Sequence, residues 1–474
     1  NSGYLDDRLN RPTNKNIFTL LDSLMSYTEQ CNSFNWLRDN SYKSELLMRV
    51  QTALNYLNSS DSLNCYKQIK LFQTSIQQVY SDSVGSYPKY VSKDAYKFLY
   101  YYPKYILERL PSPPTVKLED SQGKLLRGGS LQYYEGEGKN AIDNGDGTFM
   151  LDTKLKTISL RMTYEYGSQT KSNLTVSKDT IVFKTVNAKV KLLNSKGTPI
   201  DTGYVQYYAG GWRNFGKTVN GIVSKELLPV NYSFRVTYGY ASNDTAQNIE
   251  TNNTVEFTTV ETKVELRNSL GVLIDQGTVQ YYTGGWISFG TTEGGVATKE
   301  LLPNNYSFRM TYAYGSNDKQ QDIGTNPTVV FNTVRARVEL RNSQGNLIDG
   351  GTVQYYSGGW RSFGSKTNGT VSRELLPNNY SFRMTHEYLS LDKSQNIGTS
   401  NIVTFNTVLS RVRVSNSQNQ PINNATVRYY AGAWRNYGVT LNGEATKELL
   451  PVNVTLRAIV GTLQQDKTQN LLTN

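Results

Sequence analysis

The stretch VQYYAGGWRNFG, residues 205–216, returns along the chain as VQYYTGGWISFG, VQYYSGGWRSFG and VRYYAGAWRNYG. The tryptophans of these copies follow one another at intervals of 74 residues and are Trp212, Trp286, Trp360 and Trp434. A fixed interval of this length indicates tandem structural repeats. At 474 residues the chain is also too long for one ordinary core, so several domains are expected.

Aligning the chain on the Tyr-Tyr pair gives five repeats. They span 115–186, 187–260, 261–334, 335–408 and 409–474. In the third repeat, Tyr306, Phe308 and Met310 alternate with polar residues, which is typical of a strand with one buried face. Each repeat holds about six or seven such short strands and no helical pattern, so each should form a small β-sandwich.

A dipeptide at one fixed place in every repeat predicts a type I′ hairpin, because Asn, Asp and Gly accept positive φ angles. The dipeptides are Asp146-Gly147, Asn220-Gly221, Gly294-Gly295, Asn368-Gly369 and Asn442-Gly443. The five repeats should therefore share one strand order.

Residues 1–112 follow a different pattern, with apolar residues at helical spacing. This part predicts a small α-helical bundle, with an N-cap at 60–62 and an end at the stiff segment LPSPPTV. The two cysteines of the chain, Cys31 and Cys65, both lie here. One disulfide that pins two helix ends together is the expectation for an exported chain, and two buried thiols are the alternative.

The segment TNGTVSRELLPNNYSFRMT, residues 367–385, resembles the prealbumin-like and carboxypeptidase-regulatory-like sandwiches, relatives of the pilin-type (CnaB-like) domains of surface proteins. The resemblance covers all five repeats. It implies a mainly β protein of five tandem Ig-like or prealbumin-like β-sandwiches, of a kind that serves as stalks, spacers or glycan-binding modules. The helical part resembles, more loosely, the FIMAH-type module of secreted bacterial proteins.

Charge and hydropathy exclude several classes of protein. The net charge is +11, but the basic residues are scattered among acids, so no nucleic-acid partner is expected. No stretch of 18 apolar residues would span a membrane. The sequence starts at Asn1 without a methionine, which predicts either a mature secreted product or an excerpt of a longer precursor.

Catalytic and metal-binding residues are sparse. The one histidine, His386, stands where other repeats have Tyr238 and Tyr312, which argues against a general base. We therefore expect no enzyme, no cofactor and no metal site. Asp143, Asn144 and Asp146 resemble half a calcium loop but lack the later bidentate acid.

Pilin-type sandwiches often carry a Lys-Asn isopeptide bond next to a buried acid, and the resemblance would assign it to Lys263, Asn332 and Glu300. The fourth repeat has Arg337 in place of the lysine, which argues against a shared bond. Instead we expect four recurring glutamates to pair across strands with four recurring arginines. The glutamates are Glu226, Glu300, Glu374 and Glu448, and the arginines are Arg235, Arg309, Arg383 and Arg457.

The two tyrosines of each pair should face opposite sides of their strand, so that one is buried and one lies outside. The predicted contact residues are these outer tyrosines and the tryptophans that follow them: Tyr208 with Trp212, Tyr282 with Trp286, Tyr356 with Trp360 and Tyr430 with Trp434. Such aromatics suit packing between protein surfaces, which we favour, and equally suit stacking on sugar rings.

Ten N-x-S/T sequons add potential glycosylation sites. They are Asn58, Asn173, Asn231, Asn243, Asn252, Asn305, Asn368, Asn379, Asn424 and Asn453. The four at Asn231, Asn305, Asn379 and Asn453 share one turn, where Asn also suits the turn and Ser or Thr the next strand. Glycosylation and bare sequons both remain open.

The fifth repeat ends in TQNLLTN, where the last strand of the other repeats would begin. A sandwich without that strand exposes an unpaired edge. Either the sequence is cut short of its natural end, or a strand from another molecule fills the place. The first residues, NSGYLDDRLNRPTNK, have too few alternating apolar positions to be that strand.

These patterns together predict a non-enzymatic extracellular structural or adhesive protein at a cell surface. It would be a semi-rigid stalk of sandwiches that assembles into a filament or sheath by β-strand addition. Its partners would be other protein chains, among them further copies of itself. The alternative is the glycan-binding accessory region of a secreted polysaccharide-degrading enzyme, with cell-surface glycans as partners.

Overall fold

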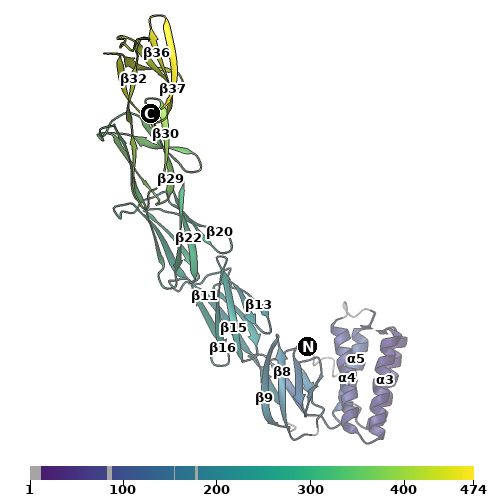
Figure 1. The fold of residues 1–474 in the computed structure, drawn as a ribbon. Coiled ribbons are helices and arrows are strands. Elements are labelled where there is room, and N and C mark those ends of the chain that lie inside the picture. Colours follow the sequence, from purple (N-terminus) through teal and green to yellow (C-terminus); the bar gives the residue numbers. More distant parts are fainter. Residues whose placement is uncertain (1–11, 83–87, 154, 177–179, 474) are drawn as a thin grey trace. The chain divides into compact units, whose positions relative to one another are not determined.

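The structure of this protein is a computed structural model that describes residues 12–82, 88–153, 155–176 and 180–473. It is mainly β, with a helical part followed by five two-layer β-sandwiches (Figure 1). The chain divides into two compact units. One holds the helical part, sandwich 1 and most of sandwich 2. The other holds sandwiches 3, 4 and 5 with two short segments of sandwich 2, Asn194–Thr198 and Tyr238–Asn243.

The helical part consists of α2 (Ile17–Ser33), α3 (Asn40–Asn58), α4 (Ser62–Ser81) and α5 (Lys93–Leu107). A short antiparallel ribbon joins β1 (Leu37–Arg38) to β2 (Tyr90–Val91). The α4 helix begins where the sequence predicts, because the Asp61 carboxylate accepts a hydrogen bond of 3.0 Å from the Asn64 amide. Leu20, Leu46 and Phe72 are fully buried in the core that the helices share.

The predicted disulfide is wrong. Cys31 and Cys65 are both free and buried, and both belong to the apolar core of the helical part. Burial raises the pKa of the Cys31 thiol to about 12 and that of Cys65 to about 11. Both thiols are therefore protonated at neutral pH and act as small apolar side chains.

Sandwich 1 pairs its strands in two sheets of order β10-β3-β7-β6 and β5-β4-β8-β9. Its strands are β3 (Thr115–Glu119), β4 (Ser130–Tyr134), β5 (Gly138–Asn140), β6 (Ile142–Asp143), β7 (Thr148–Met150), β8 (Thr157–Tyr164), β9 (Gly167–Thr175) and β10 (Ile181–Lys184). Sandwich 2 has a small sheet, β14-β11-β17, and a large sheet, β13-β12-β15-β16. Its strands are β11 (Val186–Leu193), β12 (Tyr204–Tyr208), β13 (Trp212–Lys217), β14 (Ile222–Leu227), β15 (Asn231–Tyr238), β16 (Ala241–Asn248) and β17 (Thr254–Thr258).

Sandwiches 3 and 4 repeat the sheet order of sandwich 2. Sandwich 3 contains β18 (Val260–Arg267), β19 (Thr278–Tyr282), β20 (Trp286–Thr291), β21 (Val296–Leu301), β22 (Asn305–Tyr312), β23 (Gly315–Asp322) and β24 (Thr328–Asn332). Sandwich 4 contains β25 (Val334–Arg341), β26 (Thr352–Tyr356), β27 (Trp360–Ser365), β28 (Thr370–Leu375), β29 (Asn379–His386), β30 (Leu389–Asn396) and β31 (Ile402–Asn406).

The predicted type I′ hairpins are present in sandwiches 2 to 5. In sandwich 4, for example, Asn368 and Gly369 have φ angles of 50° and 75°. The first repeat differs, because its loop has positive φ at Gly145 and Gly147 on either side of Asp146. In sandwich 2 this turn leads from β13 of the large sheet to β14 of the small sheet and is closed by the bridge between Val219 and Ile222.

The last strand of each complete sandwich is called here the closing strand. The closing strands β10, β24 and β31 run parallel to the first strands of their sandwiches, β3, β18 and β25. In sandwich 2 the closing strand β17 lies beside β11 in the same way. One buried threonine then leads from each closing strand into the first strand of the next sandwich: Thr185, Thr259, Thr333 and Thr407.

Sandwich 5 contains β32 (Val408–Arg413), β33 (Thr426–Tyr430), β34 (Trp434–Val439), β35 (Glu444–Leu449), β36 (Asn453–Val460) and β37 (Leu463–Asn470). Its large sheet, β34-β33-β36-β37, is complete by comparison with the other sandwiches. Its small sheet consists of β32 and β35, and within the described residues β32 has no strand on its other side. The edge of β32 is therefore open.

Candidate functional site

The recurring aromatic stretch has an inner and an outer part. Tyr207, Tyr281, Tyr355 and Tyr429 are buried, whereas Tyr208, Tyr282, Tyr356 and Tyr430 are about half exposed, at 50%, 47%, 50% and 50%. Each outer tyrosine lies edge-on to its tryptophan, with ring centroids 5.4 to 5.5 Å apart. An arginine from the strand two places away in the large sheet covers one face of each indole, as on β15, where Cζ of Arg235 lies 4.1 Å from the ring centroid of Trp212.

These arginines do not pair with the recurring glutamates, so that prediction is wrong. Arg383 instead makes a two-pronged ion pair with Asp392 on β30, at 2.7 and 2.8 Å. The equivalent aspartates in the other sandwiches are Asp244, Asp318 and Asp466. The hydrogen bond from Arg383 lowers the pKa of Asp392. The sequence analysis missed these partners because it did not extend the alternation into the hairpin that follows.

The recurring glutamates instead join consecutive sandwiches. Glu374 of sandwich 4 accepts hydrogen bonds from the Ser269 amide at 3.2 Å and the Ser269 hydroxyl at 2.6 Å, both in sandwich 3. It also accepts one from Thr333, the threonine between the two sandwiches. Glu226, Glu300 and Glu448 bind the equivalent serines, Ser121, Ser195 and Ser343. Each glutamate therefore anchors its sandwich to the one before it.

A second contact at the junctions comes from the buried tyrosines. The Tyr355 hydroxyl donates a hydrogen bond of 2.9 Å to the carbonyl of Ala313 in the preceding sandwich. Beside it, the Arg361 guanidinium lies 4.0 Å from the ring centroid of Tyr314. The recurring aromatic stretch thus contributes both to packing within a sandwich and to contact with the preceding sandwich.

The three residues of the isopeptide hypothesis are not brought together. Lys263 lies opposite Thr328 in the ladder of β18 and β24, whereas Asn332 lies opposite Arg267, four residues further along. Glu300 is bound to Ser195 and Thr259. The geometry does not support the bond.

In the acidic loop of the first repeat, the carboxylates accept hydrogen bonds from nearby backbone amides. Asp143 accepts from the Gly145 amide at 2.8 Å, and Asp146 accepts from the Thr148 amide at 3.0 Å. The Asn144 carbonyl accepts a hydrogen bond of 2.9 Å from Thr74 of α4, so this loop contacts the helical part. Among the described residues, no three His, Cys, Asp or Glu side chains form a group that could hold a metal ion.

His386 is half-buried at the end of β29. Burial, together with the nearby Lys366 and Lys447 charges, lowers its pKa, although Glu387 opposes this.

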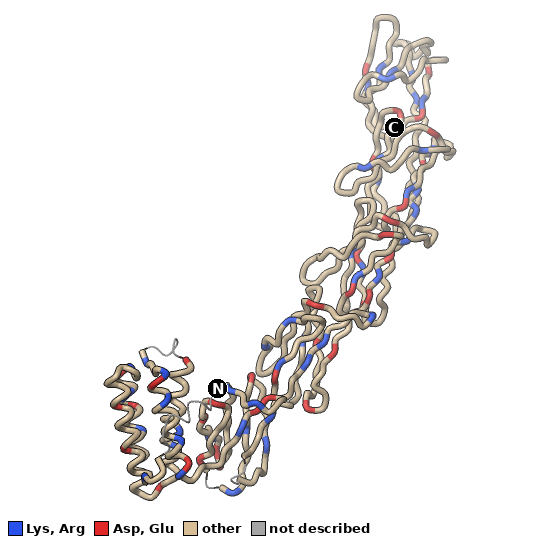
Figure 2. The backbone as a smooth tube through the Cα atoms, turned by 180° about the vertical axis from the view of Figure 1, so that it is seen from behind, with Lys and Arg blue, Asp and Glu red and all other residues tan. Residues whose placement is uncertain are grey.

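Within the described part of the chain, no helix is long and apolar enough to cross a membrane. Lys and Arg are interspersed with Asp and Glu along the backbone in Figure 2.

Nine of the ten sequon asparagines are exposed, which is what glycan attachment requires. Asn243 is the exception, because it is half-buried and donates to the Pro303 carbonyl at 3.3 Å. Whether any of these asparagines carries a glycan stays a prediction.

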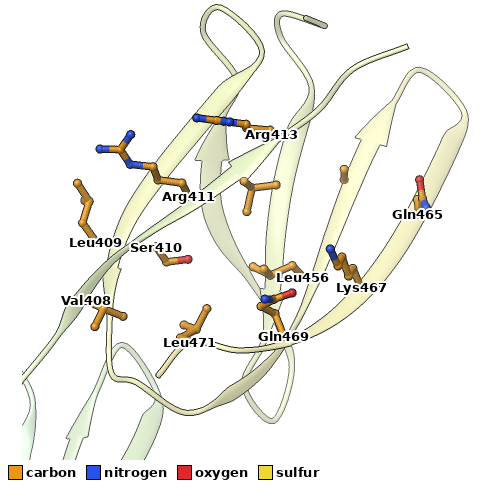
Figure 3. A pocket seen from close by; sticks show the side chains of 12 residues that line it. Val408, Leu409, Ser410, Arg411, Arg413, Leu456, Gln465, Lys467, Gln469 and Leu471 are labelled. Atoms are coloured by element: carbon orange, nitrogen blue, oxygen red, sulfur yellow. The ribbon is translucent and has the colours of Figure 1, made fainter. Parts of the chain in front are cut away.

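The open edge of sandwich 5 borders a groove of about 650 Å³ (Figure 3). Its residues are Val408–Arg413 from β32, Leu456 and Ala458 from β36, Gln465, Lys467 and Gln469 from β37, and Leu471. Figure 3 shows Leu456 and Leu471 on the floor of the groove and Lys467 and Gln469 along its far wall. Asn474 lies outside the described residues, and so do residues 1–11 of the N-terminal segment that the sequence argues against as a donor strand.

In sandwich 4 the same place is filled by the closing strand β31, and two side chains of β30 hold it. The Lys393 ammonium donates to the Thr404 carbonyl at 3.2 Å, and the Gln395 amide donates to the Ile402 carbonyl at 2.7 Å. Lys171 and Lys319 make the same contact to Val182 in sandwich 1 and Val330 in sandwich 3. The residues that correspond to Lys393 and Gln395 in sandwich 5 are Lys467 and Gln469 of the groove.

The groove therefore offers hydrogen-bonding groups to an added strand on both of its sides. On one side lies the free backbone edge of β32, and on the other lie the Lys467 and Gln469 side chains. The sequence analysis predicted the open edge but missed these two residues. Their signal was available, because a lysine recurs at this place in the first, third, fourth and fifth repeats.

No family model matches this chain, and no curated protein matches its sequence. Among solved structures, it is similar to the Bacillus anthracis TIE protein, with 13% identity, 70% of this chain and 82% of that chain covered, and a TM-score of 0.16. It is also similar to the major pilin subunit of Bacillus cereus (11% identity, 62% and 98% covered, TM-score 0.17). A third is a streptococcal ancillary pilin (13% identity, 44% and 95% covered, TM-score 0.18). Because these TM-scores are low, the function proposed below rests on the contacts of this chain itself.

Proposed function

We propose that this protein is a non-enzymatic extracellular structural or adhesive protein whose fifth sandwich accepts a β-strand from another polypeptide. The observation that carries the proposal is the groove beside β32, which keeps the lysine and glutamine that hold the closing strand in sandwich 4. A strand bound there would complete the small sheet and cover the core, as in other cases of β-strand addition. Acceptance of a strand from a neighbouring molecule would link molecules into a filament or sheath.

The repeated residues support a structural role. The inner tyrosines and the recurring glutamates are used at junctions between consecutive sandwiches. The outer tyrosines and tryptophans form one surface cluster on each of sandwiches 2 to 5. An array of this kind spaces and displays surfaces, and needs no group that titrates near neutral pH.

The test of strand acceptance uses a peptide with the sequence of residues 401–408, NIVTFNTV, which contains the closing strand of sandwich 4. Added to the 474-residue chain, it should slow hydrogen exchange of the β32 amides, measured by mass spectrometry. The matched control is the peptide with Phe405→Asp, which keeps the length and removes the aromatic side chain that fills the core. Equal exchange with and without NIVTFNTV at millimolar peptide would contradict the proposal.

A second candidate function is glycan binding at the outer aromatic clusters. The observation that favours it is a shallow pocket of about 360 Å³ beside Tyr208, Trp212 and Asp244. A sugar ring offers an apolar face for the tyrosine and hydroxyls for the aspartate. Reduced retention on insoluble polysaccharide after Tyr208→Ala with Trp212→Ala would support this function. A chain that shows no retention before the change would exclude it for that polysaccharide.

A further inference from the structure

In its charge, the groove of sandwich 5 differs from the same place in sandwiches 3 and 4. The central outward residue of the first strand is Lys117, Lys191, Glu265 and Glu339 in sandwiches 1 to 4, and Arg413 in sandwich 5. In sandwich 4, Glu339 neutralises both Arg337 and Arg341 on its own strand, at 3.0 and 2.7 Å. Sandwich 5 has no acid on β32 to do the same.

The arginines of β32 share a single carboxylate. Arg411 and Arg413 lie 3.6 and 3.3 Å from Glu444 of β35, and their side chains are 57% and 79% exposed. Lys467 stands on the opposite side of the groove. Arg411 and Arg413 therefore lie beside the open edge with one shared acid, Glu444, and Lys467 lies across the groove from them.

The register of the closing strands shows which residue of a bound strand would meet this charge. In sandwich 3, Val329, Val330 and Phe331 lie opposite Val264, Glu265 and Leu266. In sandwich 4, Val403, Thr404 and Phe405 lie opposite Val338, Glu339 and Leu340. At an interval of 74 residues, the strand bound to sandwich 5 would place a valine opposite Val412, a phenylalanine opposite Val414, and its central residue opposite Arg413.

The chain itself offers the matching combination in sandwich 2. There the central residue of the first strand is Lys191, and the equivalent residue of the closing strand β17 is Glu256. Where the first strand carries an acid, the closing strand carries Val330 or Thr404 instead, and in sandwich 1 Lys117 lies opposite the uncharged Val182. Opposite charges at directly facing positions stabilise a pair of strands, and like charges destabilise it.

From this charge complementarity, and on the basis of the proposed function, we infer that the groove selects a strand of a second polypeptide that reads Val-acid-Phe and runs parallel to β32. Valine and phenylalanine fill the apolar floor over Leu456 and Leu471. The acid between them faces outward to Arg413 and Arg411. Lys467 and Gln469 donate to carbonyls of the bound strand, as Lys393 and Gln395 do in sandwich 4.

The test compares two peptides on the 474-residue chain. One is NNTVEFTTV, residues 252–260, and the other is the same peptide with Glu256→Lys. Binding is measured by fluorescence anisotropy of a labelled peptide at low salt. We expect the acidic peptide to bind about tenfold more tightly, because two surface charge pairs change from attraction to repulsion. The ratio should shrink at high ionic strength.

A charge reversal in the protein supplies the matched control. Arg413→Glu changes an exposed residue and should leave the fold intact, while it inverts the preference between the two peptides. Equal binding of both peptides would overturn the acidic preference and leave strand acceptance standing. Failure of both peptides, with NIVTFNTV failing as well, would overturn the proposed function and this inference with it.

Discussion

Sandwich 4 and sandwich 5 are built alike except at the closing strand, and the residues around that strand differ accordingly. Met384 and Phe382 of sandwich 4 are fully buried, and the smaller Ala458 and Leu456 replace them in sandwich 5. Ala336 and Phe363 become Ser410 and Tyr437, whose hydroxyls bond to each other at 2.8 Å. Beside the groove, the core of sandwich 5 thus has smaller side chains at two positions and more polar ones at two others.

The largest difference should appear in the closing strand itself. Phe405→Ala removes an aromatic ring that is 2% exposed and is expected to destabilise sandwich 4 by about 3 to 5 kcal/mol. Hydrogen exchange resolved by peptide reports this for each sandwich, which a single melting temperature of an array does not. Tyr356→Ala, at a half-exposed position of the same sandwich, is the control. A cost below about 1 kcal/mol for Phe405→Ala would mean that sandwich 4 does not depend on its closing strand.

A matched pair of valines compares the two sandwiches directly. Val338→Ala in sandwich 4 should cost roughly 2 kcal/mol, because Val338 is fully buried beneath β31. Val412→Ala in sandwich 5 should cost less than half as much, because Val412 is only half-buried in the free protein. With the NIVTFNTV peptide bound, the two costs should converge. Equal costs without peptide would show that the groove is already filled in solution.

The junction glutamates test whether sandwich 5 is attached as firmly as sandwich 4. Glu374→Gln and Glu448→Gln each weaken the hydrogen bonds to the preceding serine and threonine and should cost about 1 kcal/mol at neutral pH. Exchange of the amides at Ser269 and Ser343 measures the two junctions separately. A much smaller effect at Glu448 would mean that the open sandwich is held by other contacts.

The same junction predicts a pH dependence. Although burial raises the pKa of Glu448, hydrogen bonds from Ser343 and Thr407 outweigh it and lower that pKa below its ordinary value of 4.5. The charged form is thus favoured by folding, so its contribution is present above pH 4.5 and is lost as the pH falls through the lowered pKa. The junction between sandwiches 4 and 5 should loosen in that acidic range, and Glu448→Gln should remove this part of the dependence. If the junction of Glu448→Gln loosens at the same acidic pH as that of the unchanged protein, Glu448 is not the group responsible for the pH dependence.

The smallest expected effect concerns the lysines that hold the closing strand. Lys393→Ala should destabilise sandwich 4 by about 0.5 to 1 kcal/mol, because it removes the hydrogen bond to Thr404. Lys467→Ala should leave the free protein unchanged and weaken peptide binding several-fold. A loss of stability from Lys467→Ala without any peptide would show that this lysine has a role inside sandwich 5.

The sequence predicts most of the fold because the alternation is strict and the period is constant. Local sequence predicts that Tyr281 is buried and Tyr282 exposed, and it predicts the Asn-Gly turns as well. Each repeat contains these local signals independently of the others. The prediction of a disulfide was wrong because two cysteines on helices can pack in an apolar core as readily as they can form a disulfide bridge. The partners of Glu374 were missed because Ser269 lies 105 residues away, in another sandwich. Contacts across junctions leave no trace in the alternation of a single strand.

The open edge and a strand bound to it were predictable from the sequence, but the side chains that would hold such a strand were not. The repeat pattern indicates an open edge in the fifth sandwich, whereas the role of Lys467 follows only from the contact that Lys393 makes in three dimensions. Comparing repeats residue by residue would have found the lysine, and only the ladder register assigns Arg413 to the central residue of a bound strand.

The parallel pairing of first and closing strands also has a mechanical meaning. The chain enters sandwich 4 at the start of β25 and leaves it at the end of β31, and these two strands lie side by side in the same direction. A force applied along the chain therefore slides one strand past the other and loads their whole row of backbone hydrogen bonds at once. In sandwich 5 the same resistance can arise only when a strand occupies the groove, so the bond between two molecules would bear tension in the same way as each sandwich does within one molecule.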